Sequence, residues 1–319
     1  MGSGGDSMVK TAFVFPGQGS QFVGMGKEFY DSDATCRAMF DEASEVLGQD
    51  IADVCFKGPE DALKLTENTQ PALLIHSSIA MKRLKEHNVS FVMAAGHSLG
   101  EFSAHVAAGS LKFRDAVHLV RQRGLFMQEA VPVGVGGMAA IIGLPLENIQ
   151  KLCNEYSVEG HVVQPANLNS PEQIVIAGHK DAVESVSGKC RDAGAKKAVI
   201  LPVSAPFHCS LMKPAEIKLK EELDNTAFQN SEIPVVTNVD VQPITQGDDA
   251  RKALVRQVCS PVRWLETMQY LVGQGVQAMV EIGSGKVLSG LMRRFDKNVQ
   301  CYQVGDPASL EKTVDALKG

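Results

Sequence analysis

The chain has 319 residues, of which 44% are hydrophobic and 21% charged, and its formal net charge is −6 at pH 7. This composition is ordinary for a globular protein with one large domain or two smaller ones. The acidic balance argues against a general nucleic-acid-binding protein. No uninterrupted apolar stretch reaches the roughly 20 residues of a membrane-spanning helix. We therefore expect a cytoplasmic protein that binds neither nucleic acid nor membranes.

The seven cysteines are scattered, odd in number and free of any Cys-x-x-Cys pair. This pattern predicts reduced thiols rather than a disulfide framework or a zinc site. No signal or transit peptide is visible. Residues 1–7 (MGSGGDS) look like a cloning remnant, which would place the native start at Met8.

The first predicted strand covers residues 9–15 (VKTAFVF), and a glycine-rich loop, PGQGSQ, follows it at 16–21. The loop lacks the Gly-x-Gly-x-x-Gly spacing of a phosphate-binding loop. It is either a tight turn or, in an α/β hydrolase-like sheet, the loop that supplies one oxyanion-binding N–H. Helical patterns follow at 34–47, 62–65 and 72–85, the last opened by Thr69-Gln70-Pro71.

A Gly-x-Ser-x-Gly turn, GHSLG at 96–100, lies between a predicted buried strand at 89–94 and a predicted helix from 102 to about 109. This is the pattern of a nucleophile elbow, although the pentapeptide also occurs by chance. Glycines let a strand and a helix pack closely around a serine with a strained backbone. Ser98 is therefore the candidate nucleophile, and the amide of Leu99 at the helix start can face an oxyanion.

Another helix is predicted at 116–130 and contains Arg123. An arginine on a helix is commonly solvated or ion-paired at the surface. Its functional use would be a fork that grips a carboxylate through two parallel hydrogen bonds. The residues alone leave both interpretations open.

The composition shifts at 131–137 (VPVGVGG), and six elements in the order βαββαβ follow, typical of a ferredoxin-like unit. We expect a subdomain at 131–204 with these elements: strand 138–144, helix 146–156, strands 161–168 and 172–179, helix 181–194 and strand 196–204. After it we expect helix 214–226, strand 233–238, helices 251–258 and 264–273, strand 278–282 and a closing helix. GSGK at 283–286 lacks the Walker A spacing and predicts a turn.

Of the eight histidines, His208 is the only one beyond the predicted subdomain, on a proline-bounded loop after a strand. A serine nucleophile needs a base within hydrogen-bond reach, and α/β hydrolases place that base late in the chain. His208 is therefore the candidate base. No aspartate is an obvious third member, so a backbone carbonyl could orient the ring instead. We expect His97 to point away from its neighbour Ser98, and Cys209 to be a buried thiol.

Seven stretches, in order, resemble the malonyl-CoA:acyl carrier protein transacylase family from about Met8 to the C-terminus. They are FPGQGSQ (15–21), GHSLGEFSA (96–104), RQRGLFMQEAVP (121–132), NLNSPEQIVIAG (167–178), FHCSLM (207–212), SPVRW (260–264) and EIGSGKVL (281–288). Seven ordered motifs are far more specific than one Gly-x-Ser-x-Gly pattern. The resemblance implies an α/β hydrolase-like core with a parallel sheet (8–130 and 205–319) and the ferredoxin-like insert at 131–204.

The resemblance also implies ping-pong transfer of a malonyl group from malonyl-CoA to the phosphopantetheine thiol of acyl carrier protein, supplying fatty acid synthesis. No cofactor is expected, because malonyl-CoA is a substrate and the phosphopantetheine belongs to the carrier protein; we expect a monomer. The implied roles are Ser98 as the acylated serine, His208 as its base, Arg123 as the partner of the malonyl carboxylate, Gln18 and Leu99 as oxyanion-binding amides, Gln257 as the main-chain carbonyl that orients the histidine, and Asn167 as a pocket-lining residue.

Three alternatives remain: a serine hydrolase such as a thioesterase or lipase, an acyltransferase module of a polyketide synthase, and a catalytically silent docking module. The acidic carrier protein poses a further question, because this chain is acidic too. A basic rim could attract it, although the same charges could be ordinary solvated faces. The rim would consist of Lys189, Arg191, Lys196, Lys197, Lys286, Arg293 and Arg294.

Overall fold

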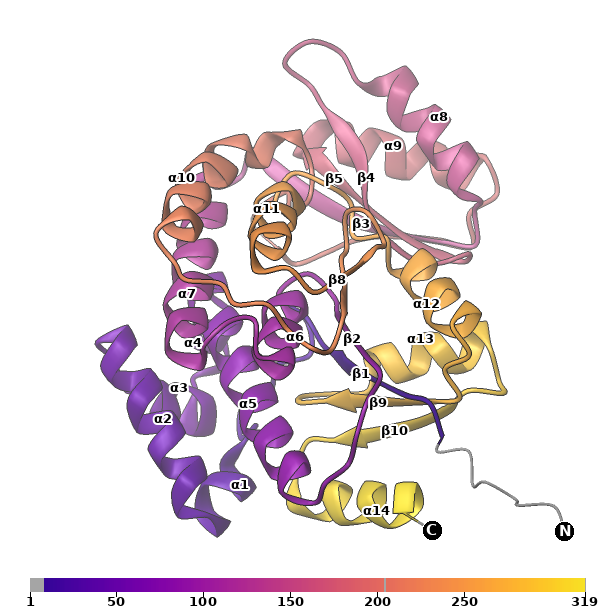
Figure 1. Cartoon of the computed structure of the whole chain (residues 1–319). Helices are drawn as coiled ribbons and strands as arrows, with labels where there is room; N and C mark the ends of the chain where they lie inside the picture. Colours follow the sequence, from indigo (N-terminus) through magenta and orange to yellow (C-terminus); the bar gives the residue numbers. More distant parts are fainter. Residues whose placement is uncertain (1–8, 204, 319) are drawn as a thin grey trace, which may run out of the picture.

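The computed structural model describes residues 9–203 and 205–318, so the expected cloning remnant at Met1–Ser7 lies outside the described residues. Within these ranges the chain is a mixed α/β protein with a mainly parallel sheet of order β10-β9-β1-β2-β7-β8 and an antiparallel sheet of order β4-β5-β3-β6. The antiparallel sheet and its helices form the upper part of the molecule in Figure 1. The expectation of an α/β protein with a parallel sheet is confirmed.

The mainly parallel sheet is built around β1 (Thr11–Phe15), whose five residues are all buried. Its other strands are β2 (Met93–Gly96), β7 (Val235–Val236), β8 (Pro243–Ile244), β9 (Ala278–Ile282) and β10 (Gln300–Val304). β1 pairs in parallel with β2 and β9, whereas β8 runs antiparallel to β7. Side chains of β1 alternate between faces: Phe13 and Phe15 belong to one apolar cluster, Ala12 and Val14 to another.

Helices cover both faces of this sheet, as buried parallel strands require. Before the antiparallel sheet they are α1 (Lys27–Ser32), α2 (Ala34–Leu47), α3 (Ile51–Lys57), α4 (Glu60–Lys64), α5 (Thr66–Glu86), α6 (Gly100–Ala108) and α7 (Phe113–Glu129). After it come the short 3-10 helix Ser210–Met212, then α10 (Lys213–Asp224), α11 (Gly247–Gln257), α12 (Trp264–Gly273), α13 (Val287–Phe295) and α14 (Pro307–Lys318). The central helix α5 packs against α6 and α7.

The antiparallel sheet is formed by one continuous stretch of chain, in the predicted order βαββαβ. Its elements are β3 (Gly136–Ile142), α8 (Leu146–Tyr156), β4 (Val163–Ser170), β5 (Gln173–His179), α9 (Lys180–Asp192) and β6 (Lys197–Ile200). It has its own apolar core, to which Ile141, Ile149, Ile176 and Val186 contribute. A bridge between Asn167 and Val262 joins β4 to the chain that leads into α12.

Helix α5 begins at Thr66, six residues earlier than predicted, and contains Pro71 in its second turn. A proline inside a helix leaves one carbonyl without its N–H donor. Here the carbonyl of Glu67, four residues before Pro71, accepts a hydrogen bond of 2.8 Å from Arg121 Nη1 on α7. Because Arg121 supplies the missing donor, the helix continues through Pro71. From the sequence alone, the proline had indicated that the helix starts there.

Other predictions of secondary structure were wrong in detail. β6 ends at Ile200, earlier than predicted, and β7 covers only Val235–Val236 instead of 233–238. The strand before the elbow is β2 at Met93–Gly96 rather than 89–94, because pairing with β1 begins only at Met93. The chain does not close on one helix: β10 and α14 follow α13. The sequence of β10, QCYQV, is only partly buried at the edge of the sheet, so it lacks the apolar run that identified β9.

Candidate active site

Ser98 occupies the turn between β2 and α6, with φ at 52°. Two residues before and two residues after Ser98, at positions 96 and 100, only glycine fits. A Cβ on Gly96 would lie 1.9 Å from the backbone of Gly100, and a Cβ on Gly100 would lie 2.0 Å from the carbonyl oxygen of Phe15. The turn is therefore packed directly onto β1, and the strand-turn-helix elbow predicted from the sequence is confirmed, with the serine in a sparsely populated backbone conformation.

The side chain of Asn238, which the sequence analysis did not identify, holds this turn in place through two hydrogen bonds. Its Oδ1 accepts a hydrogen bond of 2.8 Å from the backbone N–H of Ser98. Its Nδ2 donates one of 2.7 Å to the carbonyl of Gly96. The side-chain amide of Asn238 thus satisfies the N–H of the strained Ser98 and the carbonyl of Gly96 before it. An isolated Asn just after a short strand carries no sequence signal for this role.

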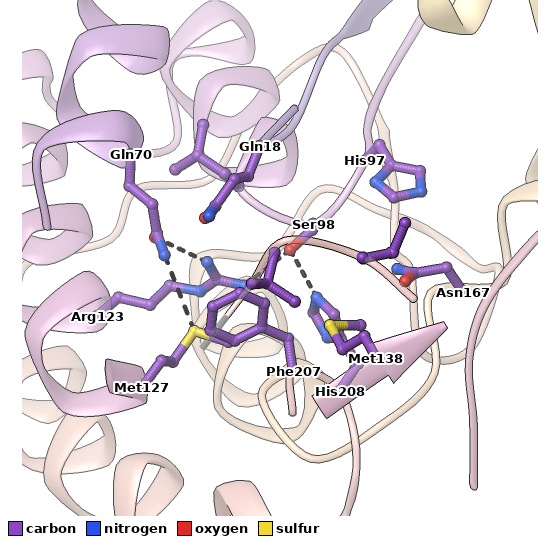
Figure 2. Close-up of a pocket in the computed structure, with 13 residues that line it drawn as sticks. Gln18, Gln70, His97, Ser98, Arg123, Met127, Met138, Asn167, Phe207 and His208 are labelled. Carbon is purple, nitrogen blue, oxygen red and sulfur yellow. Dashed lines mark hydrogen bonds between the residues drawn. The ribbon is translucent and has the colours of Figure 1, made fainter. Parts of the chain in front are cut away.

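His208 lies against the nucleophile, with Nε2 2.6 Å from Ser98 Oγ (Figure 2). On the other side of the ring, Nδ1 lies 3.0 Å from the main-chain carbonyl of Gln257. A carbonyl only accepts, so Nδ1 carries the proton and Nε2 is free to accept from the serine. Burial, together with the charge of Arg123, lowers the pKa of His208 to about 3, so the ring is neutral at neutral pH.

Arg123 on α7 is buried, with 1% of its surface exposed, and its guanidinium reaches the nucleophile. Nη2 donates to Ser98 Oγ at 3.0 Å and to Gln257 Oε1 at 2.9 Å, and Nη1 donates to Gln70 Oε1 at 2.7 Å. Burial lowers its pKa to about 10, so it remains a cation at neutral pH. The surface interpretation of Arg123 is wrong, since the side chain points into the site.

All three of these partners are neutral, and among residues 9–203 and 205–318 no carboxylate forms a direct ion pair with Arg123. The buried carboxyl of Glu101, which shares the Gln257 side chain with it, acts on it only through its charge, which raises the pKa of Arg123 against the lowering effect of burial. A buried cation without an anionic partner is costly unless a ligand supplies the charge. The site is therefore built for an anionic group next to Ser98.

A buried carboxyl, Glu101, lies beneath the elbow on α6. Its Oε2 accepts hydrogen bonds from the backbone N–H of Asn238 at 3.0 Å and from Gln257 Nε2 at 2.8 Å. Burial raises its pKa to about 7. Gln257 contacts the ring of His208 through its carbonyl, and its side chain contacts Arg123, Glu101, the carbonyl of Ser98 at 2.9 Å and Asn238 Oδ1 at 3.3 Å. The family resemblance implied the first of these contacts, and the sequence analysis missed those of the side chain.

Gln18 and Leu99 both line the cavity at Ser98. The loop that carries Gln18 packs directly on the elbow, because a Cβ on Gly17 would lie 2.4 Å from the carbonyl oxygen of His97. In the described part of the chain, neither the Gln18 nor the Leu99 backbone N–H donates to a protein acceptor. This leaves both donors for an oxyanion, and their role stays a prediction.

The cavity measures about 120 Å³ and lies between the loops after β1 and β2, helices α5 and α7, and strands β3 and β4 of the antiparallel sheet (Figure 2). It is lined by Gln18, Gln70, His97, Ser98, Leu99, Arg123, Met127, Met138, Asn167, Leu201, Val203, Phe207 and His208. Asn167 of β4 is 8% exposed, and its expected place on the cavity wall is confirmed. His97 also lines the cavity, but its Nε2 bonds Asn169 Oδ1 at 2.8 Å rather than Ser98.

The seven residues of the expected basic rim are all exposed. Lys189 lies 3.9 Å from Asp192, and Lys196 lies 3.7 Å from Glu172. Such surface pairs contribute little and leave the cations available. The rim and its function stay a prediction.

A serine held against a neutral histidine, with a buried cation beside both, is the site of an acyl-transferring enzyme. The family described as the acyl transferase domain matches residues 12–304. Malonyl CoA-acyl carrier protein transacylase of Bacillus subtilis (strain 168) is 46% identical over 311 residues, covering 98% of both chains. The protein of the same name from Escherichia coli (strain K12) is 49% identical over 310 residues, covering 97% of this chain and all of the relative (100%).

Solved structures agree with these relatives. The malonyl CoA-acyl carrier protein transacylase of Coxiella burnetii superposes with a TM-score of 0.95 at 40% identity, covering 98% of this chain and 99% of that one. A malonyl-transacylase in complex with a type II polyketide synthase acyl-carrier protein gives a TM-score of 0.93 at 45% identity, covering 96% and 99%. The chain therefore belongs to the acyl transferase family and, within it, to the malonyl CoA-acyl carrier protein transacylases. The resemblance found in the seven motifs is confirmed.

Among the helices of residues 9–203 and 205–318, none combines the length and the apolar character needed to span a bilayer.

Proposed function

We propose that this chain transfers the malonyl group from malonyl-CoA to the phosphopantetheine thiol of acyl carrier protein through a malonyl-Ser98 intermediate. The product would supply extender units for fatty acid synthesis. The observation that carries this proposal is the buried Arg123, 3.0 Å from Ser98 Oγ and without an anionic partner among the described residues. A malonyl group attached to Ser98 would carry its free carboxylate within reach of this guanidinium.

In the first half-reaction, Ser98 Oγ attacks the thioester carbonyl of malonyl-CoA while His208 Nε2 takes the hydroxyl proton. The amides of Gln18 and Leu99 hold the tetrahedral oxyanion; the loss of one such donor typically costs about 2.7–4 kcal/mol. Collapse breaks the C–S bond, and the CoA thiolate leaves with the proton from His208. In the second half-reaction the carrier thiol gives its proton to His208 and attacks malonyl-Ser98; collapse breaks the C–O bond of the ester, and Ser98 Oγ takes the proton back from His208.

Arg123 would select the acyl group by pairing with its carboxylate. An acetyl or fatty acyl group would leave the buried guanidinium without a counter-ion. A lipase or thioesterase acting on uncharged acyl groups has no use for this cation. The 2.6 Å contact between Ser98 and His208 supports an active nucleophile and argues against a silent docking module.

We also propose an α/β hydrolase-like core of residues 8–130 and 205–319, with a ferredoxin-like insert at 131–204. The strand order β4-β5-β3-β6 and the βαββαβ succession support the insert. Malonyl-CoA and acyl carrier protein are the proposed partners of a monomeric, cytoplasmic enzyme. The chemistry above needs only amino-acid side chains and backbone N–H groups, so the proposal includes no cofactor.

The test is the intact mass of the protein after mixing with malonyl-CoA, followed by addition of phosphopantetheinylated acyl carrier protein. We expect one malonyl adduct, which the carrier protein removes and itself acquires. Ser98→Ala should gain no adduct, whereas Ser103→Ala, on helix α6 beyond the elbow, should still gain it. Loss of the adduct to water instead of the carrier would favour a hydrolase, and no adduct at all would refute the proposal.

A further inference from the structure

Ser98 Oγ has two partners, His208 Nε2 at 2.6 Å and Arg123 Nη2 at 3.0 Å (Figure 2). A hydroxyl has one proton to donate and two lone pairs. The proton faces His208, so Arg123 donates to a lone pair that would otherwise be available for attack. A hydrogen bond from a cation is stronger than one from a neutral donor and reduces the electron density on the oxygen. The cation that would bind the substrate therefore holds the nucleophile.

The same guanidinium also opposes the proton transfer. Attack by Ser98 makes His208 an imidazolium, and a second cation beside Arg123 in a buried site is unfavourable. The charged and titratable groups that act on the His208 ring are Arg123 from α7 and His97 from the elbow, and both lower its pKa. The carbonyl of Gln257 and the backbone of Ser260 act in the opposite direction. In the empty site the base is therefore weak as well.

Arg123 is, moreover, incompletely satisfied. Its Nε–H is buried and has no acceptor within the described ranges 9–203 and 205–318. A carboxylate at this cation forms charge-assisted hydrogen bonds, competes with Ser98 Oγ for the guanidinium and cancels its charge. Each of these effects makes Ser98 a better nucleophile or His208 a better base.

We propose that Arg123 keeps Ser98 at rest in the empty enzyme and that the carboxylate of the incoming acyl group releases it. This inference rests on the proposed function and deepens it. It means that the enzyme prefers malonyl-CoA partly because Ser98 is acylated faster by bound malonyl-CoA, and not only because malonyl-CoA binds more tightly. Uncharged acyl groups then react slowly even when bound. The carboxylate of the substrate thus activates the serine that attacks the thioester of the same substrate.

The experiment separates the two parts of the malonyl group. Acetyl-CoA provides the thioester, and sodium formate provides a free carboxylate small enough for the cavity of about 120 Å³. The first-order rate of Ser98 acetylation is measured by rapid quench and intact mass at saturating acetyl-CoA, with sodium chloride of equal ionic strength as the reference. We expect formate to raise this rate by about tenfold, the effect of one pKa unit in the base. An unchanged or lower rate overturns the inference.

With malonyl-CoA as the substrate, formate should lower the rate of Ser98 acylation, because formate then competes with the substrate carboxylate for Arg123. Arg123→Ala should acetylate faster than the wild type and should not respond to formate. Arg114→Ala removes an exposed arginine from the same helix and should respond as the wild type does. Acceleration by formate that persists in Arg123→Ala would assign the effect to another site and overturn the inference.

The two proposals fail in different ways. If malonyl-CoA gives the adduct but formate does not accelerate acetylation, the proposed function stands and the release mechanism is wrong. If malonyl-CoA gives no adduct on Ser98, the proposed function itself is wrong. A measurement of the acetylation rate against acetyl-CoA concentration adds a further criterion: formate should act on the plateau rather than on the half-saturating concentration.

Discussion

Asn238 and Ser98 lie 140 residues apart in the sequence, yet the side chain of the first bonds the backbone N–H of the second at 2.8 Å. The same side chain donates to the carbonyl of Gly96, so it spans the turn on both sides of the serine. Ser98 has a φ of 52°, a backbone conformation that residues other than glycine rarely adopt. Asn238 is therefore a positioning residue for the nucleophile.

Asn238→Ala should slow acylation of Ser98 by malonyl-CoA by about 10–100-fold, since small misplacements of a reacting group have effects of this size. The half-saturating malonyl-CoA concentration should change little, because Arg123 remains in place. Rapid-quench acylation measures both quantities. Asn148→Ala, an exposed asparagine on α8, is the control. Equal losses in rate and in affinity would indicate a general loss of structure instead of misplacement of Ser98.

Gln257→Ala separates the main chain of that residue from its side chain. The main-chain carbonyl that orients His208 remains, whereas the side-chain contacts to Arg123, Glu101 and the Ser98 carbonyl disappear. We expect the preference for malonyl-CoA over acetyl-CoA to fall by roughly tenfold, the loss of about one hydrogen bond to a charged group. Competition between the two thioesters, read out by adduct mass, measures the ratio. A preference that stays at the wild-type value would show that Arg123 needs no support from Gln257.

Glu101 makes stability depend on pH. Its pKa is about 7 in the folded protein against an ordinary value of 4.5, so the folded state binds the proton more tightly than the unfolded chain. The stabilisation is complete below pH 4.5 and is lost as the pH rises through 7.

Glu101→Gln keeps an acceptor for both donors and removes the titration. Relative to the wild type, it should gain on the order of 2–3 kcal/mol of unfolding free energy between pH 5 and pH 8. Urea unfolding at both pH values gives the difference. Glu147→Gln, on the exposed side of α8, should show no such gain. A constant difference between the two proteins across this range would mean that Glu101 is ionised in the fold at both pH values.

Gly100→Ala should destabilise the protein by several kcal/mol, more than ~3, because overpacking against a rigid backbone cannot relax. Its Cβ would lie 2.0 Å from the carbonyl oxygen of Phe15. Gly188→Ala on α9 is the opposite case, since a Cβ there meets nothing within 4 Å. It should stabilise the protein by about 0.5–1 kcal/mol, the helix preference for alanine. Thermal unfolding of both variants compares them directly; similar destabilisation by both would contradict the packing argument.

Ser98 and His208 were predictable because each leaves a local pattern. The glycines around Ser98 indicate a close approach of the backbone, and the isolated late position of His208 indicates a base. The family resemblance supplied what local patterns did not, namely the roles of Arg123, Gln18 and Gln257. The βαββαβ succession was equally readable, because its strands and helices alternate with distinct periodicities.

The residues that hold the site together were not predictable. Asn238 and Glu101 contact the elbow through pairings across the fold, and an asparagine or glutamate in isolation is expected at the surface. Pro71 misled for a related reason: the carbonyl it frees is satisfied by Arg121 from another helix. Each of these depends on a tertiary partner that no local window of sequence contains.

Cys209 follows the base directly, yet its thiol donates to the carbonyl of Pro206 at 3.1 Å and is 1% exposed. Burial raises its pKa to about 12, which keeps the sulfur protonated. A protonated thiol is a poor acyl acceptor. The thiol next to the candidate base is thus kept from taking up the acyl group, which leaves the proposed malonyl ester on Ser98 for the thiol of the carrier protein.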